Sequence, residues 1–421
     1  MLIHSASQVL TISGGPQVHP NFGHLGIIRD GAVLIQGESI GAVGATDALL
    51  KKYPQEPRID ARGMVVMPGL VDPHTHLVWA GDRAAEFEQR LEGKSYMEIL
   101  SAGGGINATV QATRCADFDT LYQQTRQHAD ACFITGTTTL EAKTGYGLQI
   151  DQEIKQLSVL AVLADRHPLE ICPTFLGAHA IPPEFSNDPS AYAREVADHM
   201  LPQVKRWWTQ EFPEKSLPFV DVFCEEGAFD IHQSRRILGQ AKKLGFPLKI
   251  HADEFKNIGG AALAAHMGAV SADHLVKTSA ADMSALAQAG TVAVSLPCTP
   301  FGLAEREYTP AREMIKAGCV LALASDLNPG TAWCGNMQFA IALACRSMRL
   351  TPAEAIAAAT INAAAAVQMD KQIGSIEAGK QADILILNVN DYRHVAYRFG
   401  NNMVGAIIKK GKQYLPPWQS Q

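Results

Sequence analysis

Short apolar runs alternate with longer amphipathic stretches through the middle of the chain. The runs are rich in β-branched and small residues, which favours strands at 136–140, 170–176, 220–224, 247–250, 269–272, 292–296 and 320–324. The stretches between them have the length and polarity of helices, for example 151–166, 191–208, 232–244 and 259–267. With a further strand at 70–77 this makes eight strands in βα alternation. The pattern predicts an α/β fold, a (β/α)₈ barrel of the TIM type.

The two ends of the chain have a different pattern from the middle. Short β-branched runs separated by glycine-rich turns occur at 9–12, 32–35 and 40–43, and again at 382–387 and 404–409. Two β-rich ends around a different middle predict one small β-sandwich domain built from both termini. We therefore expect residues 1–66 and 371–421 to form the sandwich and residues 67–370 to form the barrel. An alanine-rich apolar window at 355–369 predicts one buried helix.

Composition narrows the classes of function. With 421 residues, 47% hydrophobic and 19% charged, the chain has the make-up of a globular protein, and its net charge of -6 argues against nucleic-acid or anionic-membrane partners. No secretory signal opens the sequence, and no apolar run reaches the roughly 20 residues that a membrane span needs. The 8 cysteines are scattered without a Cys-x-x-Cys spacing, which is typical of reduced thiols in a cytoplasmic protein.

Two histidines in the strand at 70–77 suggest a metal site. Residues two apart in a strand point to the same side, so His74 and His76 present two imidazoles to one place, with Asp72 on the same face one layer further back. A nitrogen-rich pair suits zinc or iron(II), whereas calcium and magnesium prefer oxygen ligands. A lone His-x-His is more often two ordinary histidines on a half-buried strand, so the rest of the chain has to decide.

Polar residues also follow the fifth, sixth and eighth predicted strands. His251 ends the fifth, His274 the sixth, and Asp326 follows the eighth. In (β/α)₈ barrels the chemistry sits at the carboxyl ends of the strands. Singly, His251 fits a core histidine and Asp326 a helix cap, but four ligand types at strand ends rarely coincide. The sequence therefore predicts a mononuclear metal site of His74, His76, His251 and Asp326, with one position left for water.

These motifs carry a family resemblance over essentially the whole chain. Pro68-Gly-x-x-Asp-x-His-x-His76, the later Ser325-Asp326 and the split β-domain resemble the amidohydrolase superfamily. Further motifs, at 81–83, 143–147, 175–179, 251–254 and 326–331, resemble the imidazolonepropionase family. The resemblance implies hydrolysis of the cyclic amide of 4-imidazolone-5-propanoate to N-formimidoyl-L-glutamate, in histidine degradation. It also implies one divalent metal ion per subunit, zinc or iron(II), and a homodimer.

The resemblance also suggests roles for residues around the metal. Glu254, three residues after a ligand, is the first choice for moving the proton from water to the departing nitrogen, and Asp326 is the alternative. His274 is expected to hydrogen-bond the attacked oxygen or the water. Because one metal is implied, Lys143 is interpreted as a structural residue or one that lies directly behind the metal ligands, rather than as a carboxylated lysine that bridges two metals.

The substrate's propanoate tail requires a cation. Arg83, in the loop after the first barrel strand, has a guanidinium fork that matches a carboxylate, an assignment that rests mainly on the resemblance. The other residues expected at the substrate or product are Tyr146, His179, Glu254, Asn328, Gly330 and Thr331.

Two rival functions remain open on the sequence alone. A related amidohydrolase that deaminates a cytosine- or guanine-like ring would use the same metal, Glu254 and His274, but Arg83 and Tyr146 favour an anionic tail. A catalytically inactive amidohydrolase-like scaffold protein would be expected to have lost ligands, and all four are present.

Overall fold

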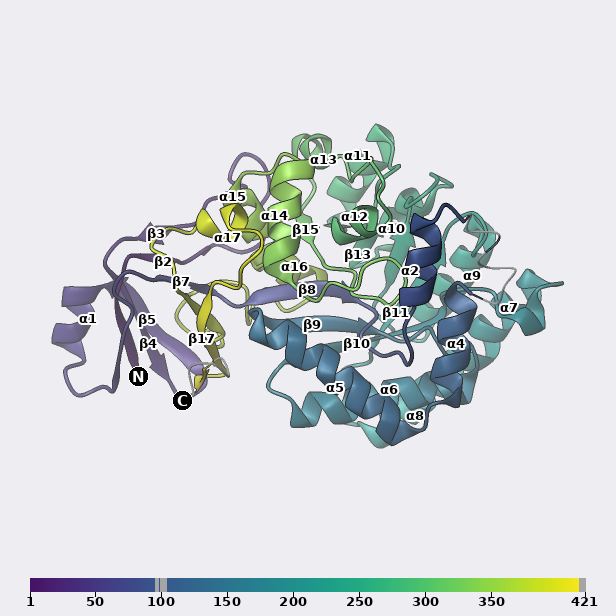
Figure 1. Cartoon of the computed structure of the whole chain (residues 1–421), viewed down its shortest axis with the longest axis horizontal. Helices are drawn as coiled ribbons and strands as arrows, with labels where there is room; N and C mark the ends of the chain where they lie inside the picture. Colours follow the sequence, from purple (N-terminus) through teal and green to yellow (C-terminus); the bar gives the residue numbers. More distant parts are fainter. Residues whose placement is uncertain (95–97, 99–103, 416–421) are drawn as a thin grey trace.

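The computed structural model describes residues 1–94, 98 and 104–415, and its centre is a barrel of parallel strands (Figure 1). The strands are hydrogen-bonded in chain order: β8 (Leu70–Thr75), β9 (Thr137–Lys143), β10 (Glu170–Ala178), β11 (Phe219–Cys224), β12 (Lys249–Ala252), β13 (Ser271–His274), β14 (Val292–Ser295) and β15 (Leu321–Leu323). All eight match strands predicted from the apolar runs, so the barrel prediction is confirmed.

The barrel closes just beyond the ends of its first and last strands. The backbone N–H of Asp326 donates to the carbonyl of His74 at 3.1 Å, and that of His76 donates to the carbonyl of Leu327 at 2.9 Å. These two bonds place residues 74–76 beside residues 326–327, so closure of the barrel brings candidate ligands together from opposite ends of the sequence.

Helices surround the barrel, and many begin at a side-chain cap. Among them are α2 (Ala84–Leu91), α4 (Ile106–Cys115), α5 (Phe118–Ile134), α6 (Ile150–Arg166), α7 (Pro189–Arg194), η2 (Glu195–Met200), α8 (Leu201–Glu211), α9 (Ile231–Lys243), α10 (Gly260–Met267), α11 (Ala280–Ala289), α12 (Cys298–Gly302), α13 (Ala311–Ala317) and α14 (Met337–Ser347). Asp230, for example, accepts from the backbone N–H groups of His232 and Gln233 and starts α9 with a capping box. None of the described helices is long and apolar enough to cross a membrane.

The prediction of a single helix over 355–369 is wrong. The segment forms two short helices, α15 (Pro352–Ala358) and α16 (Ile361–Ala366), with Thr360 in a non-helical conformation between them. The amide of Asn362 explains the break, because it donates to the carbonyls of Leu321 at 2.8 Å and Gln17 at 3.0 Å. Those buried carbonyls gain a partner at the cost of helix continuity.

The two chain ends form a pair of sheets beside the barrel, at the left of Figure 1. One sheet has the order β5 (Ser39–Ala45), β4 (Gly31–Gln36), β1 (Leu2–Ala6), β6 (Arg58–Asp60); α1 (Thr46–Lys52) packs against it. The other runs β18 (Lys412–Tyr414), β17 (Val404–Lys409), β16 (Ile384–Leu387), β7 (Val65–Pro68), β2 (Gln8–Leu10), β3 (Ile27–Ile28). Because β7 pairs with both β16 and β2, the termini share a sheet and the predicted sandwich is confirmed. The exact residue bounds of the two domains stay a prediction.

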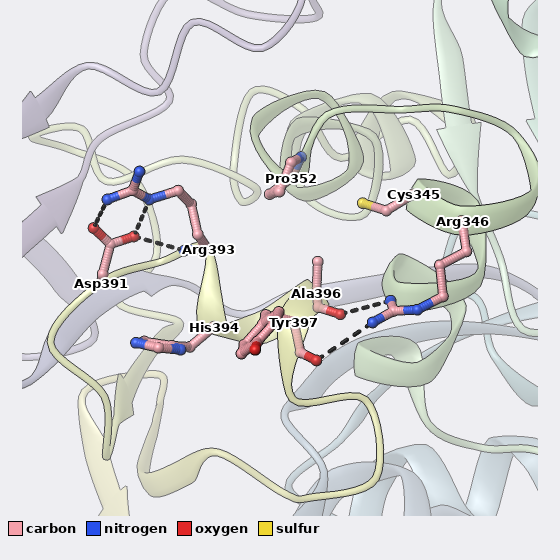
Figure 2. Close-up of a pocket in the computed structure, with 8 residues that line it drawn as sticks. All are labelled: Cys345, Arg346, Pro352, Asp391, Arg393, His394, Ala396 and Tyr397. Atoms are coloured by element: carbon pink, nitrogen blue, oxygen red, sulfur yellow. Dashed lines mark hydrogen bonds and ion pairs between the residues drawn. The ribbon is translucent and has the colours of Figure 1, made fainter.

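The C-terminal segment also contacts the barrel's outer helices through α17 (His394–Tyr397). Arg346, on α14, donates to the carbonyls of Ala396 at 2.8 Å and Tyr397 at 3.3 Å (Figure 2). A pocket of about 580 Å³ lies here, and in it Arg393 pairs with Asp391 at 2.6 Å. The two arginines of this pocket therefore have partners within the protein, Arg346 in two backbone carbonyls and Arg393 in Asp391.

Candidate active site

Four side chains converge where the carboxyl ends of the barrel strands meet. His74 lies on β8, His76 directly after it, His251 on β12, and Asp326 after β15, and all four are buried. The Nε2 atoms of His74 and His76 are each 3.5 Å from Oδ1 of Asp326, and the Nε2 atoms of His76 and His251 are 3.4 Å apart. Donor atoms of His74, His76 and Asp326 thus form one close group, and Nε2 of His251 lies beside that of His76.

The donor atoms have the properties expected of metal ligands. Nε2 of His74 and Oδ1 of Asp326 are buried, yet neither has a hydrogen-bond partner within the described ranges, whereas buried polar atoms are nearly always paired. Three imidazole nitrogens and one carboxylate oxygen suit zinc or iron(II). A second close group of possible ligand atoms adds His274 to His74 and His251. These residues fit a divalent metal ion.

Two aspartates fix the orientation of two of the imidazoles. Oδ2 of Asp273 lies 2.6 Å from Nδ1 of His74, and Oδ2 of Asp221 lies 3.0 Å from Nδ1 of His251. A proton held on Nδ1 leaves the Nε2 lone pair free to face the centre. Burial, reinforced by nearby cationic groups, holds the pKa of His74 well below its usual range, so this imidazole is neutral, as ligation requires.

The backbone at two site residues is strained. Asp326 has φ 56° and His274 has φ 78°, in the left-handed region that residues other than glycine seldom adopt. The Thr299 hydroxyl, on α12, donates to Oδ2 of Asp326 and leaves Oδ1 facing the imidazoles. Burial raises the pKa of Asp326 to about 6. The hydrogen bond from Thr299 and the restricted backbone conformation of residue 326 thus hold the Asp326 carboxylate in one orientation.

Glu254 and His274 lie beside the four ligands. Oε2 of Glu254 is 3.6 Å from Nδ1 of His274, and both side chains border a cavity of about 510 Å³ that Thr299 also lines. Burial raises the pKa of Glu254 well above its usual value, and the charge of Asp326 acts in the same direction. A carboxyl group that faces a cavity and whose raised pKa makes its carboxylate a stronger base is suited to proton transfer.

Comparisons with known proteins agree with this geometry. The model of the amidohydrolase family matches residues 65–414, and that of the bacterial imidazolonepropionase-like composite domain matches residues 31–55. The imidazolonepropionase of Herpetosiphon aurantiacus is 47% identical over 411 residues, covering 98% of this chain and 96% of the relative. That of Geobacillus kaustophilus is 45% identical over 419 residues, with 98% and 97% covered. The chain belongs to the imidazolonepropionase family of amidohydrolases.

Solved structures share the fold of this imidazolonepropionase family member at much lower identity. Escherichia coli guanine deaminase superposes with a TM-score of 0.74 at 14% identity and covers 99% of both chains. An adenosine deaminase from Xanthomonas campestris with bound zinc gives 0.68 at 19%, covering 98% of this chain and 92% of the other. At these identities the likeness shows the fold alone.

Arg83 lies at the N-terminus of α2 and is oriented by a neighbour. Its Nε and Nη2 each lie 2.8 Å from Oε2 of Glu86. Gly330 approaches the same guanidinium so closely that a Cβ atom there would lie 2.2 Å from Nη1 of Arg83. The structure therefore brings Arg83 and Gly330 of the predicted substrate residues together, and a side chain at position 330 would displace the arginine.

Tyr146 and His179 form an aromatic wall next to the ligands. The His179 ring stacks on His76 with centroids 4.7 Å apart, and the Tyr146 ring lies 5.3 Å from that of His179. Nδ1 of His179 is 3.0 Å from the carbonyl oxygen of Gly145, which leaves Nε2 as an acceptor. Burial lowers the pKa of His179 to about 3, so the ring is neutral.

Asn328 and Thr331 belong to the loop that follows Asp326. The Asn328 side-chain oxygen accepts from the backbone N–H groups of Gly330 and Thr331, both at 2.8 Å, and its amide donates to the Asp326 carbonyl at 2.7 Å. Asn328 thus shapes this loop with both the oxygen and the nitrogen of its side-chain amide.

Several residues of the site were not predicted from the sequence. Asp221 and Asp273 contact candidate ligands, and Thr299 binds Asp326. Asp72, which was predicted to lie one layer behind the two histidines, accepts from the Ser325 backbone at 3.0 Å and from its hydroxyl. Asp72 therefore ties the first barrel strand to the last, one layer behind the ligands. An aspartate inside an apolar run, as in Val220-Asp-Val222, is the signal that could have identified Asp221.

The carboxylate of Glu153 is also part of the site's support and was likewise missed. It accepts from the backbone N–H groups of Gly145 at 3.0 Å, Gly147 at 2.8 Å and Leu148 at 2.7 Å. It therefore holds the loop that presents Tyr146 and the carbonyl that orients His179.

Proposed function

We propose that this protein hydrolyses 4-imidazolone-5-propanoate to N-formimidoyl-L-glutamate, a step of histidine degradation. The observation that carries the proposal is the full-length similarity to imidazolonepropionases, at 43–47% identity over about 98% of the chain. The converging candidate ligands, together with an arginine next to Gly330 in the loop that follows Asp326, supply the chemistry that such a reaction requires. The deaminase alternative has support only from distant structures, and the scaffold alternative does not account for an intact ligand set.

One divalent metal ion, zinc or iron(II), would be held by His74, His76, His251 and Asp326. When bound, such an ion lowers the pKa of water towards neutrality. The unpaired Nε2 of His74 and Oδ1 of Asp326 support this assignment.

Proton transfer is assigned to Glu254. The oxygen of water forms a bond to the ring carbonyl carbon, the C–N bond of the cyclic amide breaks, and the nitrogen must gain the proton that the water loses. Glu254 faces the cavity and takes up that proton readily because burial raises its pKa. His274, buried and held neutral, can donate one hydrogen bond to the attacked oxygen. Asp326 is the alternative proton carrier.

The propanoate tail is assigned to Arg83, with Tyr146, His179, Asn328, Gly330 and Thr331 around the substrate and product. One oxygen of Glu86 contacts both Nε and Nη2 along one edge of the Arg83 guanidinium, which fixes the direction of the guanidinium. A charge-assisted hydrogen bond contributes about 1.5–3 kcal/mol, so loss of the arginine should weaken recognition roughly 10–100-fold.

The test is turnover of freshly made 4-imidazolone-5-propanoate, followed by its ultraviolet absorbance. Metal-replete protein should consume the substrate, chelated protein should not, and Arg83→Met should raise KM about 10–100-fold. Arg236→Met is the control, because Arg236 forms an exposed pair with Asp198 on the outer surface. Replete protein that deaminates a nucleobase instead would overturn the substrate assignment. Activity on neither would favour the scaffold.

We further propose a cytoplasmic homodimer, as the family resemblance implies. All 8 cysteines are free thiols, which supports a reducing compartment. Sedimentation of the purified protein tests the dimer: a monomer at micromolar concentration would contradict it.

A further inference from the structure

A cluster of charged side chains fills the barrel interior behind the ligands. Its members, each 0% exposed, are Glu141, Lys143, Asp221, Lys249 and Asp273. Ionised groups so far from water require partners, because an unpaired buried charge costs several kcal/mol. The partners that each group finds therefore indicate what the cluster does.

Lys143 lies between three of the acids. Its Nζ is 2.8 Å from Oε1 of Glu141, 2.9 Å from Oδ2 of Asp221 and 3.9 Å from Oδ2 of Asp273. The same Glu141 oxygen also accepts from the Thr174 hydroxyl, and Oε2 of Glu141 accepts from the backbone N–H of Thr75 at 3.3 Å. The ammonium group is thus fixed in the barrel interior by strands β9 and β11, with Asp273 of β13 at the edge of ion-pair distance.

The oxygens that face Lys143 are the ones that orient the metal ligands. Oδ2 of Asp221 is 3.0 Å from Nδ1 of His251, and Oδ2 of Asp273 is 2.6 Å from Nδ1 of His74. The Asp221 oxygen is therefore shared closely between Lys143 and one imidazole, whereas the Asp273 oxygen contacts its imidazole closely and lies 3.9 Å from both Lys143 and Lys249. A carboxylate held at one oxygen by two cationic or N–H groups cannot rotate without losing both.

Lys249 does not have the same position. It donates to the Ser271 hydroxyl at 2.7 Å and to the Pro73 carbonyl at 3.3 Å, and it lies 3.9 Å from Asp273. Among the lysines and arginines that the structure describes, Lys143 alone is within ion-pair distance of Asp221. It is also the one cation that reaches both aspartates.

We propose that Lys143 is a positioning residue for the metal centre: its ammonium group holds Asp221, which orients His251, and adds a weaker attraction to Asp273, which orients His74. This inference rests on the proposed metal site and deepens it. Lys143 touches neither substrate nor metal, and acts through Asp221 and Asp273. Loss of partners that orient ligands typically weakens metal binding 10–100-fold, and we expect Lys143→Met to fall in that range.

The experiment measures zinc affinity by competition with a chromophoric chelator, alongside thermal unfolding of each metal-free protein. Wild type should bind one zinc ion per chain, and Lys143→Met should bind it about 10–100-fold more weakly. Lys143→Arg keeps the charge but cannot reproduce the three contacts of a compact ammonium, and its affinity should lie between the two. Lys409→Met, which removes another buried lysine from between two carboxylates far from the ligands, is the matched control and should bind zinc as wild type does.

A double variant separates positioning from a general loss of stability. If Lys143 acts largely through Asp221, then Lys143→Met combined with Asp221→Asn should bind zinc only slightly more weakly than Asp221→Asn alone. Fully additive losses would contradict the proposal, as would a folded Lys143→Met protein with wild-type affinity. Should Lys143→Met not fold, wild-type affinity in Lys143→Arg would overturn it. Wild-type protein that binds no zinc or iron(II) would instead refute the proposed metal site.

Discussion

Two buried lysines each lie between carboxylates, Lys143 inside the barrel and Lys409 on β17 of the terminal sheet, and their surroundings differ. Nζ of Lys409 is 2.6 Å from Asp383 and 2.9 Å from Glu170, and the Gln381 amide donates to both acids. Lys410 covers the remaining Asp383 oxygen through its backbone. Around Lys143, by contrast, the chain of contacts continues to imidazoles and ends at atoms that have no partner within the described residues.

This difference separates two uses of buried charge. In the cluster around Lys409 each hydrogen bond ends within the cluster, which joins the C-terminal strand β17 to the start of barrel strand β10. In the cluster around Lys143 the contacts lead to donor atoms that a metal would complete. A buried ion pair alone therefore does not indicate a functional site; unpaired ligand atoms at the end of its contacts do.

The largest effect on activity is expected at Glu254. This residue lies beside the candidate ligands, and its contact with His274, at 3.6 Å, is longer than the contacts of Lys409 with its two acids. Glu254→Gln should lower kcat about 10²–10⁴-fold, because proton transfer by a positioned carboxyl contributes that much. Metal content and unfolding temperature should stay near the wild-type values. Steady-state kinetics with metal analysis make the measurement. An unchanged kcat would transfer the proton role to Asp326.

Glu153 makes the comparison sharper. It lies against the site, but its carboxylate oxygens are paired with backbone N–H groups, as the acids around Lys409 are paired with their neighbours. Glu153→Gln replaces one of two oxygens that accept from backbone N–H groups with an amide nitrogen, which cannot accept. KM should rise about 10-fold through displacement of Tyr146 and His179, and the free energy of unfolding should fall by about 1–3 kcal/mol. Kinetics and denaturant unfolding measure the two effects separately. Lower stability with unchanged KM would make Glu153 purely structural.

The smallest effect on activity is expected at Lys409. Burial opposes ionisation of Glu170, but the charge and hydrogen bond of Lys409, the hydrogen bond from Gln381 and the charge of Lys410 together outweigh it and hold the pKa of Glu170 below its usual 4.5. A carboxyl whose pKa is lowered on folding adds stability above its unfolded pKa, and that stability is lost as the pH falls through the folded value. Lys409→Met should therefore cost about 3 kcal/mol at neutral pH and less in acid, with kcat/KM unchanged. A stability loss that is the same from neutral pH to pH 3 would contradict this account.

The sequence was sufficient for the barrel, the β-rich termini and the convergence of the ligands. Apolar runs mark the strands, and the rule that chemistry sits at their carboxyl ends brings His74, His76, His251 and Asp326 together. Each of these inferences depends on local pattern and on one general property of the fold. The break at Thr360 was missed because it depends on carbonyls of Gln17 and Leu321, which are remote in sequence.

The partners of the buried charges could not be predicted for the same reason. Lys143 and Asp221 lie on strands that are not neighbours in the barrel, so neither spacing nor periodicity relates them. Sequence could mark each as a polar residue in an apolar strand, but only the register of the strands decides which oxygen meets which nitrogen.

Closure of the barrel has a consequence for how the protein is made. Asp72 and Ser325, which bond across the seam beside the ligands, are 253 positions apart. At about 5–20 residues per second, a ribosome takes roughly 10–50 s to synthesise the chain between them. During that interval His74 and His76 are already present, but Asp326 is not. A truncated chain therefore lacks one of the four proposed ligands, so the proposed metal site can be complete only in polypeptides whose synthesis has passed the last barrel strand.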